Sequence, residues 1–141
     1  MLAAHNVVRG RAGVAPLTWS DRLAAHSQEW ADTLWARKQF FHRPNSTYGE
    51  NLFEVTGAIA SPAQVVSAWA AESRNYDYSS NRCRGVCGHY TQIVWSTTTG
   101  VGCAQTNCTT GSPFGTFSNG DWTYSVCDFS PPGNYVGESP Y

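Results

Sequence analysis

The stretch that decides the fold is Gly88-His89-Tyr90-Thr91-Gln92-Ile93-Val94-Trp95. Apolar and polar side chains alternate over residues 90–96, and this period of two predicts a β-strand. Strand formation does not explain a histidine beside a glycine at the entrance of the segment. Nor does it explain the upstream segment Gly49-Glu50-Asn51-Leu52 or the downstream segment that runs from Cys127 to Tyr135.

Three helices are predicted in the first half of the chain. Apolar residues recur at helical spacing in each of them, and each has a start or stop signal. Ser61-Pro62 is the clearest start, because serine caps a helix and proline at the first position has no N–H to leave unpaired. The predicted boundaries are residue 2 to Gly10 or Gly13, Thr18 or Ser20 to Arg37-Lys38, and Ser61 to about Asn75.

Strand signals dominate the second half of the chain. They lie at residues 90–96, 100–106 and 122–128, and Thr97 to Gly100 predicts a hairpin-type connection between the first two. A short helical turn is predicted from Glu50 to Val55. Helices first and strands last favour an α+β fold, in which helices pack on an antiparallel sheet.

The composition excludes several classes of protein. A chain of 141 residues fits one domain, residues 1–141, and its net charge is −1. Nucleic-acid binding and electrostatic membrane attachment both need a basic excess, which this chain lacks. No run of about 18 apolar residues exists, so no transmembrane helix is expected. We expect a monomer.

Cysteine usage indicates an oxidising compartment. Five cysteines lie between residues 83 and 127, and such a cluster suggests disulfides in a secreted protein. The residues alone leave the pairing open, because four cysteines permit three connectivities and could also stay reduced. The chain begins directly in a helical pattern, and we assume that Met1 stands where a signal segment has been removed.

Seven short segments, spread along nearly the whole chain, occur in the order that one protein family shows. They are Leu2-x-x-His5-Asn6-x-x-Arg9, Pro16-Leu17-Thr18-Trp19, Tyr48-Gly49-Glu50-Asn51-Leu52, Trp69-x-x-Glu72, Cys87-Gly88-His89-Tyr90-Thr91-Gln92, Gly102-Cys103-Ala104 and Gly133-Asn134-Tyr135-Val136-Gly137. In these segments the sequence resembles the CAP superfamily of cysteine-rich secretory proteins, antigen 5 proteins and pathogenesis-related group 1 proteins. The resemblance implies an α-β-α sandwich with a central antiparallel sheet.

The resemblance also implies a cleft that contains His42, Glu50, Glu72 and His89. Two imidazoles, His42 and His89, can offer nitrogen lone pairs to a metal, and Zn²⁺ suits nitrogen ligands at an open site. The two carboxylates can hold the outer N–H of each ring. Such a site binds metal more weakly than a structural site with three or four protein ligands. The remaining histidines, expected to serve packing or the surface, are His5 and His26.

Each of the four cleft residues also has a purely structural interpretation. Glu50 can cap a turn, Glu72 can lie on a solvated helix face, and His89 can bond to backbone at a strand entrance. The resemblance favours the functional interpretation for these three. His42 can be an ordinary loop histidine, and Arg43-Pro44 follows it where many relatives have serine.

Lipid binding is the expected function. Several members of the superfamily bind sterols or fatty acids, the sterols beside a loop that corresponds here to residues 76–86. Tyr76, Tyr78 and Val86 could contact such a ligand, since tyrosine offers an apolar ring face while its hydroxyl stays wet. The structural alternative is that the tyrosines seal the core beneath the loop.

Two alternatives come from other functional classes. A metal-dependent peptide or ester hydrolase would use water activated by the metal or by a glutamate, and Ser46 is the serine nearest to His42 in sequence. The chain lacks a nucleophile elbow and a His-Glu-x-x-His helix, so we expect binding rather than catalysis. The other alternative is an interaction module for a cell-wall or host-surface component.

The disulfide pattern implied by the resemblance is Cys83–Cys87 and Cys103–Cys127. A third family bridge would join Cys108 to a position that is Lys38 here. The resemblance therefore implies that Cys108 is a free thiol and that the segment carrying His42 lacks a covalent anchor. We hypothesise that His42 is more mobile as a result.

Overall fold

A four-stranded sheet forms the middle layer of the structure, a computed structural model that describes residues 1–110 and 120–141. Its order is β1-β5-β6-β2. The long strands β5 (Gly100–Cys108), β6 (Trp122–Ser130) and β2 (Gly49–Thr56) are antiparallel, as expected. The two-residue strand β1 (Thr18–Trp19) pairs in parallel with β5 at the edge.

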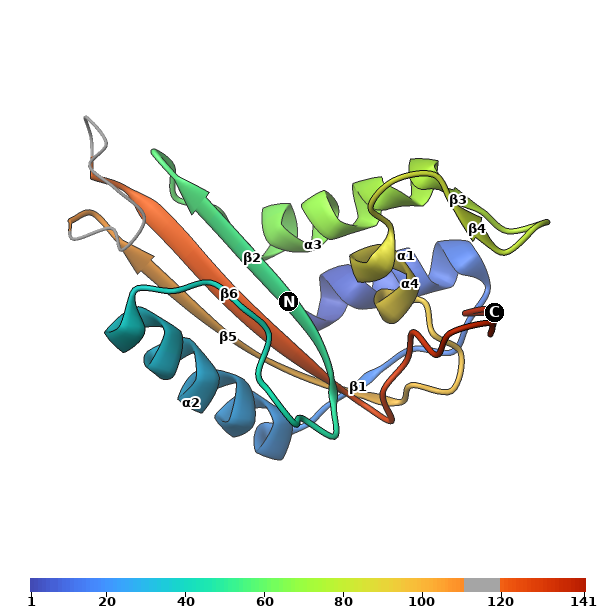
Figure 1. Cartoon of the computed structure of the whole chain (residues 1–141), viewed down its shortest axis with the longest axis horizontal. Coiled ribbons are helices and arrows are strands. Elements are labelled where there is room, and N and C mark those ends of the chain that lie inside the picture. The colour runs from blue at the N-terminus through green and yellow to red at the C-terminus, as the bar shows by residue number, and fades with distance from the viewer. Residues whose placement is uncertain (111–119) are drawn as a thin grey trace.

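Helices cover both faces of this sheet (Figure 1). Helix α2 (Asp21–Arg37) lies on one face, and α1 (Leu2–Ala12), α3 (Pro62–Ala70) and α4 (Gly88–Ile93) lie on the other. This arrangement confirms the α-β-α sandwich. The smaller elements that follow α3 are the 3-10 helix η1 (Ala71–Asn75) and the strands β3 (Tyr76–Asp77) and β4 (Arg82–Cys83).

Strand β6 supplies apolar side chains to both layers of the core. Successive residues of a strand point to opposite faces. Tyr124 and Val126 therefore pack with Leu34 of α2, whereas Cys127 and Phe129 belong to the cluster under α3 and α4. Both faces of β6 are buried, so its polar residues Thr123, Ser125 and Asp128 are buried together with its apolar ones.

The predicted helix boundaries are largely correct. Gly13 ends α1 in the left-handed conformation, with φ of 74°. Ser20 caps α2 by accepting a hydrogen bond from the Leu23 N–H, and Ser61 forms a capping box with Gln64 at the start of α3. The third helix ends at Ala70 and continues to Asn75 as η1.

The predicted strand at residues 90–96 is wrong, because residues 88–93 form α4. The apparent alternation misled because the whole of Tyr90–Trp95 is buried, so the polar positions do not mark a solvent face. The Thr91 hydroxyl bonds to the Cys87 carbonyl, and the Gln92 amide accepts from the Gly133 N–H. Thr97 to Gly100 therefore connects a helix to a strand and is not a hairpin.

The predicted helical turn from Glu50 to Val55 is also wrong. These residues lie in β2, which pairs with β6 over all eight of its residues. A strand that finds a partner along its whole length gains a complete ladder of backbone hydrogen bonds, and this tertiary pairing overrides local preference.

The cysteine pattern agrees with the resemblance. Disulfides join Cys83 to Cys87 and Cys103 to Cys127, and Cys108 is free. In residues 1–110 and 120–141, every helix is too short or too polar to cross a membrane.

Candidate functional site

Two histidine–glutamate pairs come together from four separate segments. Nδ1 of His42, in the loop after α2, lies 2.6 Å from Oε1 of Glu50 on β2. Nδ1 of His89, on α4, lies 2.6 Å from Oε1 of Glu72 on η1. When a carboxylate holds the Nδ1–H of a neutral imidazole, the lone pair on Nε2 is left for a ligand.

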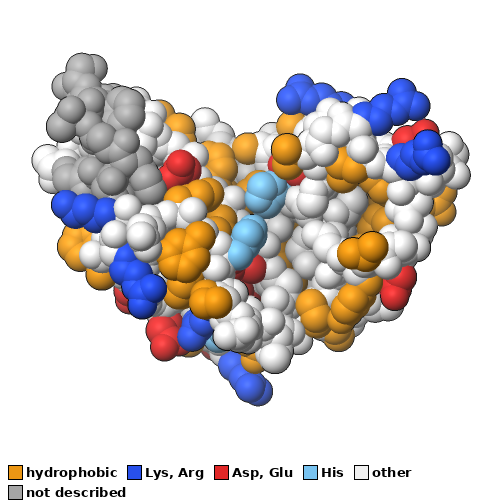
Figure 2. Space-filling view, viewed as in Figure 1, with side chains coloured by type: hydrophobic (Ala, Val, Ile, Leu, Met, Phe, Trp, Pro, Cys, Tyr) orange, Lys and Arg blue, Asp and Glu red, His pale blue; other side chains and the backbone are white. Residues whose placement is uncertain are grey.

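Both histidines line one hollow of about 180 Å³. Figure 2 shows histidine side chains in the hollow near the middle of this face of the molecule. Glu50 lines the same hollow, and Glu72 reaches it through the His89 ring. The structure thus brings all four predicted residues to one place. The full lining is His42, Glu50, Asn51, Val86, Gly88, His89 and Asn134.

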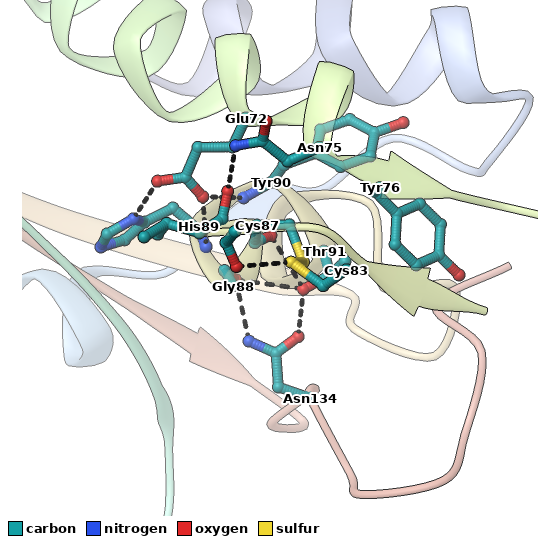
Figure 3. Close-up of a disulfide and its surroundings, with 12 residues drawn as sticks. Glu72, Asn75, Tyr76, Cys83, Cys87, Gly88, His89, Tyr90, Thr91 and Asn134 are labelled. Atoms are coloured by element: carbon teal, nitrogen blue, oxygen red, sulfur yellow. Dashed lines mark hydrogen bonds and ion pairs between the residues drawn. A yellow bond between two sulfur atoms is a disulfide. The ribbon is translucent and has the colours of Figure 1, made fainter.

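Glu72 also fixes the start of α4. Its Oε2 accepts hydrogen bonds from the backbone N–H groups of His89, at 3.0 Å, and Tyr90, at 3.4 Å (Figure 3). The ring of His89 stacks on Trp69, with centroids 6.0 Å apart. The Glu72 side chain is only 16% exposed, so it does not lie on a solvated helix face.

Glu50 is the most enclosed carboxylate of the cleft. Its side chain is 6% exposed, and Oε1 accepts from both His42 Nδ1 and the Arg43 N–H. Its Oε2 is buried and has no hydrogen-bond partner among the described residues. The hydrogen bond that His42 makes to the Glu50 carboxylate is the largest of the effects that raise the pKa of His42 above its ordinary value. Glu50 therefore lies in strand β2 and holds His42, and it does not cap a turn.

The donor types of these residues are those of a divalent metal site with open positions. Two imidazoles with carboxylate-held Nδ1 atoms match the usual support of histidine ligands. A second group, His5, Cys103 and Cys127, has ligand-type atoms within 4.8 Å of one another. Both of its sulfurs are in a disulfide and offer no thiolate, so this group does not fit a metal.

The three residues expected to form a lipid loop do not share one surface. Tyr76 packs against the core and lines a hollow of about 260 Å³ beside Cys83. The exposed ring of Tyr78 stacks on Tyr141 with centroids 4.9 Å apart. Val86, 63% exposed, lines the histidine cleft. Tyr76 therefore has the core-sealing role that was the structural alternative.

Ser46 does not form a nucleophilic pair with His42 in this structure. Its hydroxyl accepts from the Tyr48 N–H and donates to the Tyr48 carbonyl. The Ser-His-Glu form of the hydrolase alternative therefore lacks its first contact.

Sequence reasoning missed several residues that shape the cleft. Asn134 donates to the Gly88 carbonyl and accepts from the Thr91 hydroxyl, which ties the C-terminal segment to α4 (Figure 3). Nδ1 of His26, a residue expected to serve packing or the surface, lies 2.7 Å from Oδ2 of buried Asp128. Only Asn134 had a sequence signal, since it lies in the Gly133-Asn134 segment. His26 and Asp128 lie 102 positions apart in the sequence, so no local signal indicated their contact.

Comparison with known proteins assigns the chain to one family. The pattern of the cysteine-rich secretory protein family, CAP, matches residues 2–129, and the chain belongs to this family. Within it, the chain is similar to pathogenesis-related protein 1A of Nicotiana tabacum, with 44% identity over 99% of the chain and 78% of the relative. It is 39% identical to pathogenesis-related protein 1 of Arabidopsis thaliana, over 99% of the chain and 80% of the relative.

Solved structures agree on the fold. Venom allergen-like protein 4 of Schistosoma mansoni has a TM-score of 0.75 at 22% identity and covers 99% of this chain and 90% of its own. NaASP2, crystallised with Zn²⁺, has a TM-score of 0.75 at 24% identity and covers 99% and 82%. These likenesses concern the fold alone.

Proposed function

We propose that this protein is an extracellular binder of a small lipid, a fatty acid or sterol, and that its histidine cleft binds Zn²⁺. The two disulfides support an oxidising compartment. One observation carries the lipid proposal: an apolar groove between α1 and α3.

The groove forms because small side chains on both helices leave the space between them unfilled. Its walls are one face of α1 and one face of α3, each with residues at helical spacing i, i+3, i+4 and i+7. The hollow measures about 300 Å³, at the lower end of volumes typical of ligand pockets. The lining residues are Ala4, Val7, Val8, Arg11, Ala63, Val66, Ser67 and Ala70.

A second hollow continues the groove toward the predicted lipid loop. It measures about 370 Å³, shares Val8, Arg11 and Ala70 with the first, and adds Tyr78 and Tyr141. Arg11, exposed at the junction, is a cation that suits the carboxylate of a fatty acid. An acyl chain could lie along the alanines and valines with its carboxylate at Arg11. This favours a fatty acid over a sterol.

The test is a filter-binding assay with radiolabelled palmitate and cholesterol. Ser67→Trp places a large ring in the groove and should reduce palmitate retention at least about tenfold, because it removes the apolar contact area. Ala68→Trp is the matched control, since Ala68 is the next residue, is exposed and does not line the groove. Equal retention by both variants would contradict the groove as the binding site.

In the metal cleft, Nε2 of His42 and of His89 would bind Zn²⁺, and Glu50 and Glu72 would hold the two rings. The bound metal would supply a positive charge that joins the loop after α2 to α4. Two protein nitrogens leave the coordination open, which is compatible with exchange rather than with a permanent structural ion.

Metal-dependent hydrolysis is the second candidate, supported by the Glu50 carboxylate that lines the cleft beside both histidines. This carboxylate would act as a general base on water in the cleft. Hydrolysis of a peptide or ester substrate that survives both EDTA and Glu50→Ala would exclude the cleft as its source. If the assay retains neither lipid, the result would favour the third alternative, a module that binds a cell-wall or host-surface component.

A further inference from the structure

We propose that Arg43 is the positioning residue that holds His42 in the metal cleft, in the place of the covalent anchor that this chain lacks. The inference rests on the proposed function for its metal readout. It concerns the loop of residues 39–48, which joins α2 to β2 and carries His42.

This loop needs side-chain anchors because it belongs to no regular element. Residues 39–48 form no helix or strand, and Lys38 before them adopts the left-handed conformation, with φ of 51°. Cys108 is unpaired. The His42 side chain is 65% exposed and is bonded through Nδ1 to Glu50. An exposed imidazole on an irregular segment keeps one position only if its neighbours are fixed.

Arg43 makes four contacts that fix this course. Its backbone N–H donates to Glu50 Oε1 at 3.1 Å, the same oxygen that His42 contacts. Its guanidinium donates to the His26 carbonyl at 3.2 Å and to Glu29 Oε2 at 2.9 Å. The guanidinium carbon lies 5.8 Å from the ring centroid of Trp30. The backbone of Arg43 is thus bonded to the cleft and its side chain to α2.

The three α2 contacts lie on one face of the helix, at positions i, i+3 and i+4. Trp30, the last of them, donates its indole N–H to the Phe41 carbonyl at 3.1 Å and packs edge-on against the Phe41 ring. The residues on both sides of His42 are therefore bonded to the same helix. Each contact is separate from the His42–Glu50 hydrogen bond, so the loop position does not depend on that pair alone.

The chemistry requires arginine. A planar guanidinium can donate to two acceptors in different directions while its face lies on an aromatic ring, whereas the point charge of lysine cannot do both. The Arg43 side chain is 23% exposed, which strengthens these contacts relative to those of a fully solvated side chain. Arg43→Lys should therefore behave like Arg43→Gln and not like the wild type.

Two measurements test the inference. Hydrogen exchange of the amides of residues 41–43 should be faster in Arg43→Gln, with no metal present. Zn²⁺ affinity, measured by calorimetry with ZnCl₂, should fall about tenfold, as for other groups that support a metal ligand. The matched control is Arg22→Gln, because Arg22 is an exposed arginine on the same helix. This control should change neither quantity.

A double-mutant cycle separates positioning from general destabilisation. If Arg43 acts through His42, then Arg43→Gln should leave the residual Zn²⁺ affinity of a His42→Ala protein unchanged. Unchanged exchange at residues 41–43, or an equal loss of affinity with and without His42, would overturn the inference. A wild type that binds no Zn²⁺ would refute the metal part of the proposed function, while hydrogen exchange would still decide the role of Arg43.

Discussion

Arg9 should contribute more to the stability of this fold than its place on a short helix suggests. Its side chain is fully buried and donates to four backbone carbonyls: Ala15 at 2.6 Å, Ile93 at 2.8 Å, Trp95 at 2.9 Å and Thr98 at 3.0 Å. Three of these carbonyls lie at the end of α4 and in the link to β5. Arg9 therefore joins α1 to the segment that carries His89.

Arg9→Met keeps an unbranched apolar stem and removes every donor. Each buried carbonyl left unsatisfied costs about 1–3 kcal/mol. The Trp95 carbonyl keeps a hydrogen bond from the Thr98 N–H, so three carbonyls lose their partner. At the low end of that range, three carbonyls give a loss of about 3 kcal/mol. A loss of that size is a large part of the total stability of a typical domain, about 5–15 kcal/mol.

The assay is urea unfolding followed by tryptophan fluorescence, with Arg11→Met as control. Arg11 lies on the same helix and is exposed, so its replacement should change the free energy of unfolding by less than about 0.5 kcal/mol. A loss of less than about 1 kcal/mol in Arg9→Met, with an unchanged slope, would refute this reasoning. It would mean that water replaces the guanidinium at little cost.

Two further predictions concern pH and metal. Burial lowers the pKa of His5 from 6.5 to about 4, so the unfolded chain binds more protons than the folded one between these pH values. The free energy of unfolding should therefore fall by about 3 kcal/mol as the pH drops through this window. Urea midpoints should show this loss in the wild type and not in His5→Phe. Zn²⁺ binding requires neutral His42, whose pKa is raised by Glu50, so affinity should rise as pH increases from 6.5 to 8. Calorimetry should also show at least about tenfold weaker binding in His89→Ala, and equal isotherms for both proteins would argue against the cleft as the site.

Predictions from the sequence were correct where the signal lay within a few neighbouring residues, and wrong where the conformation depends on residues far away in the chain. Ser20, Ser61 and Gly13 are caps whose effect is confined to a few neighbouring residues, and their predicted roles are confirmed. The segments at 50–55 and 90–96 were predicted wrongly because their conformation depends on distant partners. One pairs with β6 along its length, and the other is buried on every side.

The four cleft residues were found through a resemblance, and their partnerships were not predictable one by one. The sequence could not say that Glu50 pairs with His42 and Glu72 with His89, because η1 and the loop after α2 place these groups. Arg43 looked like a departure from the family pattern. In the structure its guanidinium bonds to α2, which no local signal indicated.

The sequence by itself determined the family, the helix caps, the likeness of the cysteine pattern to that of relatives, and the charge balance that disfavours nucleic acid. These are properties of short segments or of composition. Only the tertiary structure decided which carboxylate holds which imidazole, which hollow receives apolar side chains from two helices, and what anchors His42. Such contacts form between residues far apart in the chain, and their geometry is set by how the helices pack on both faces of the sheet.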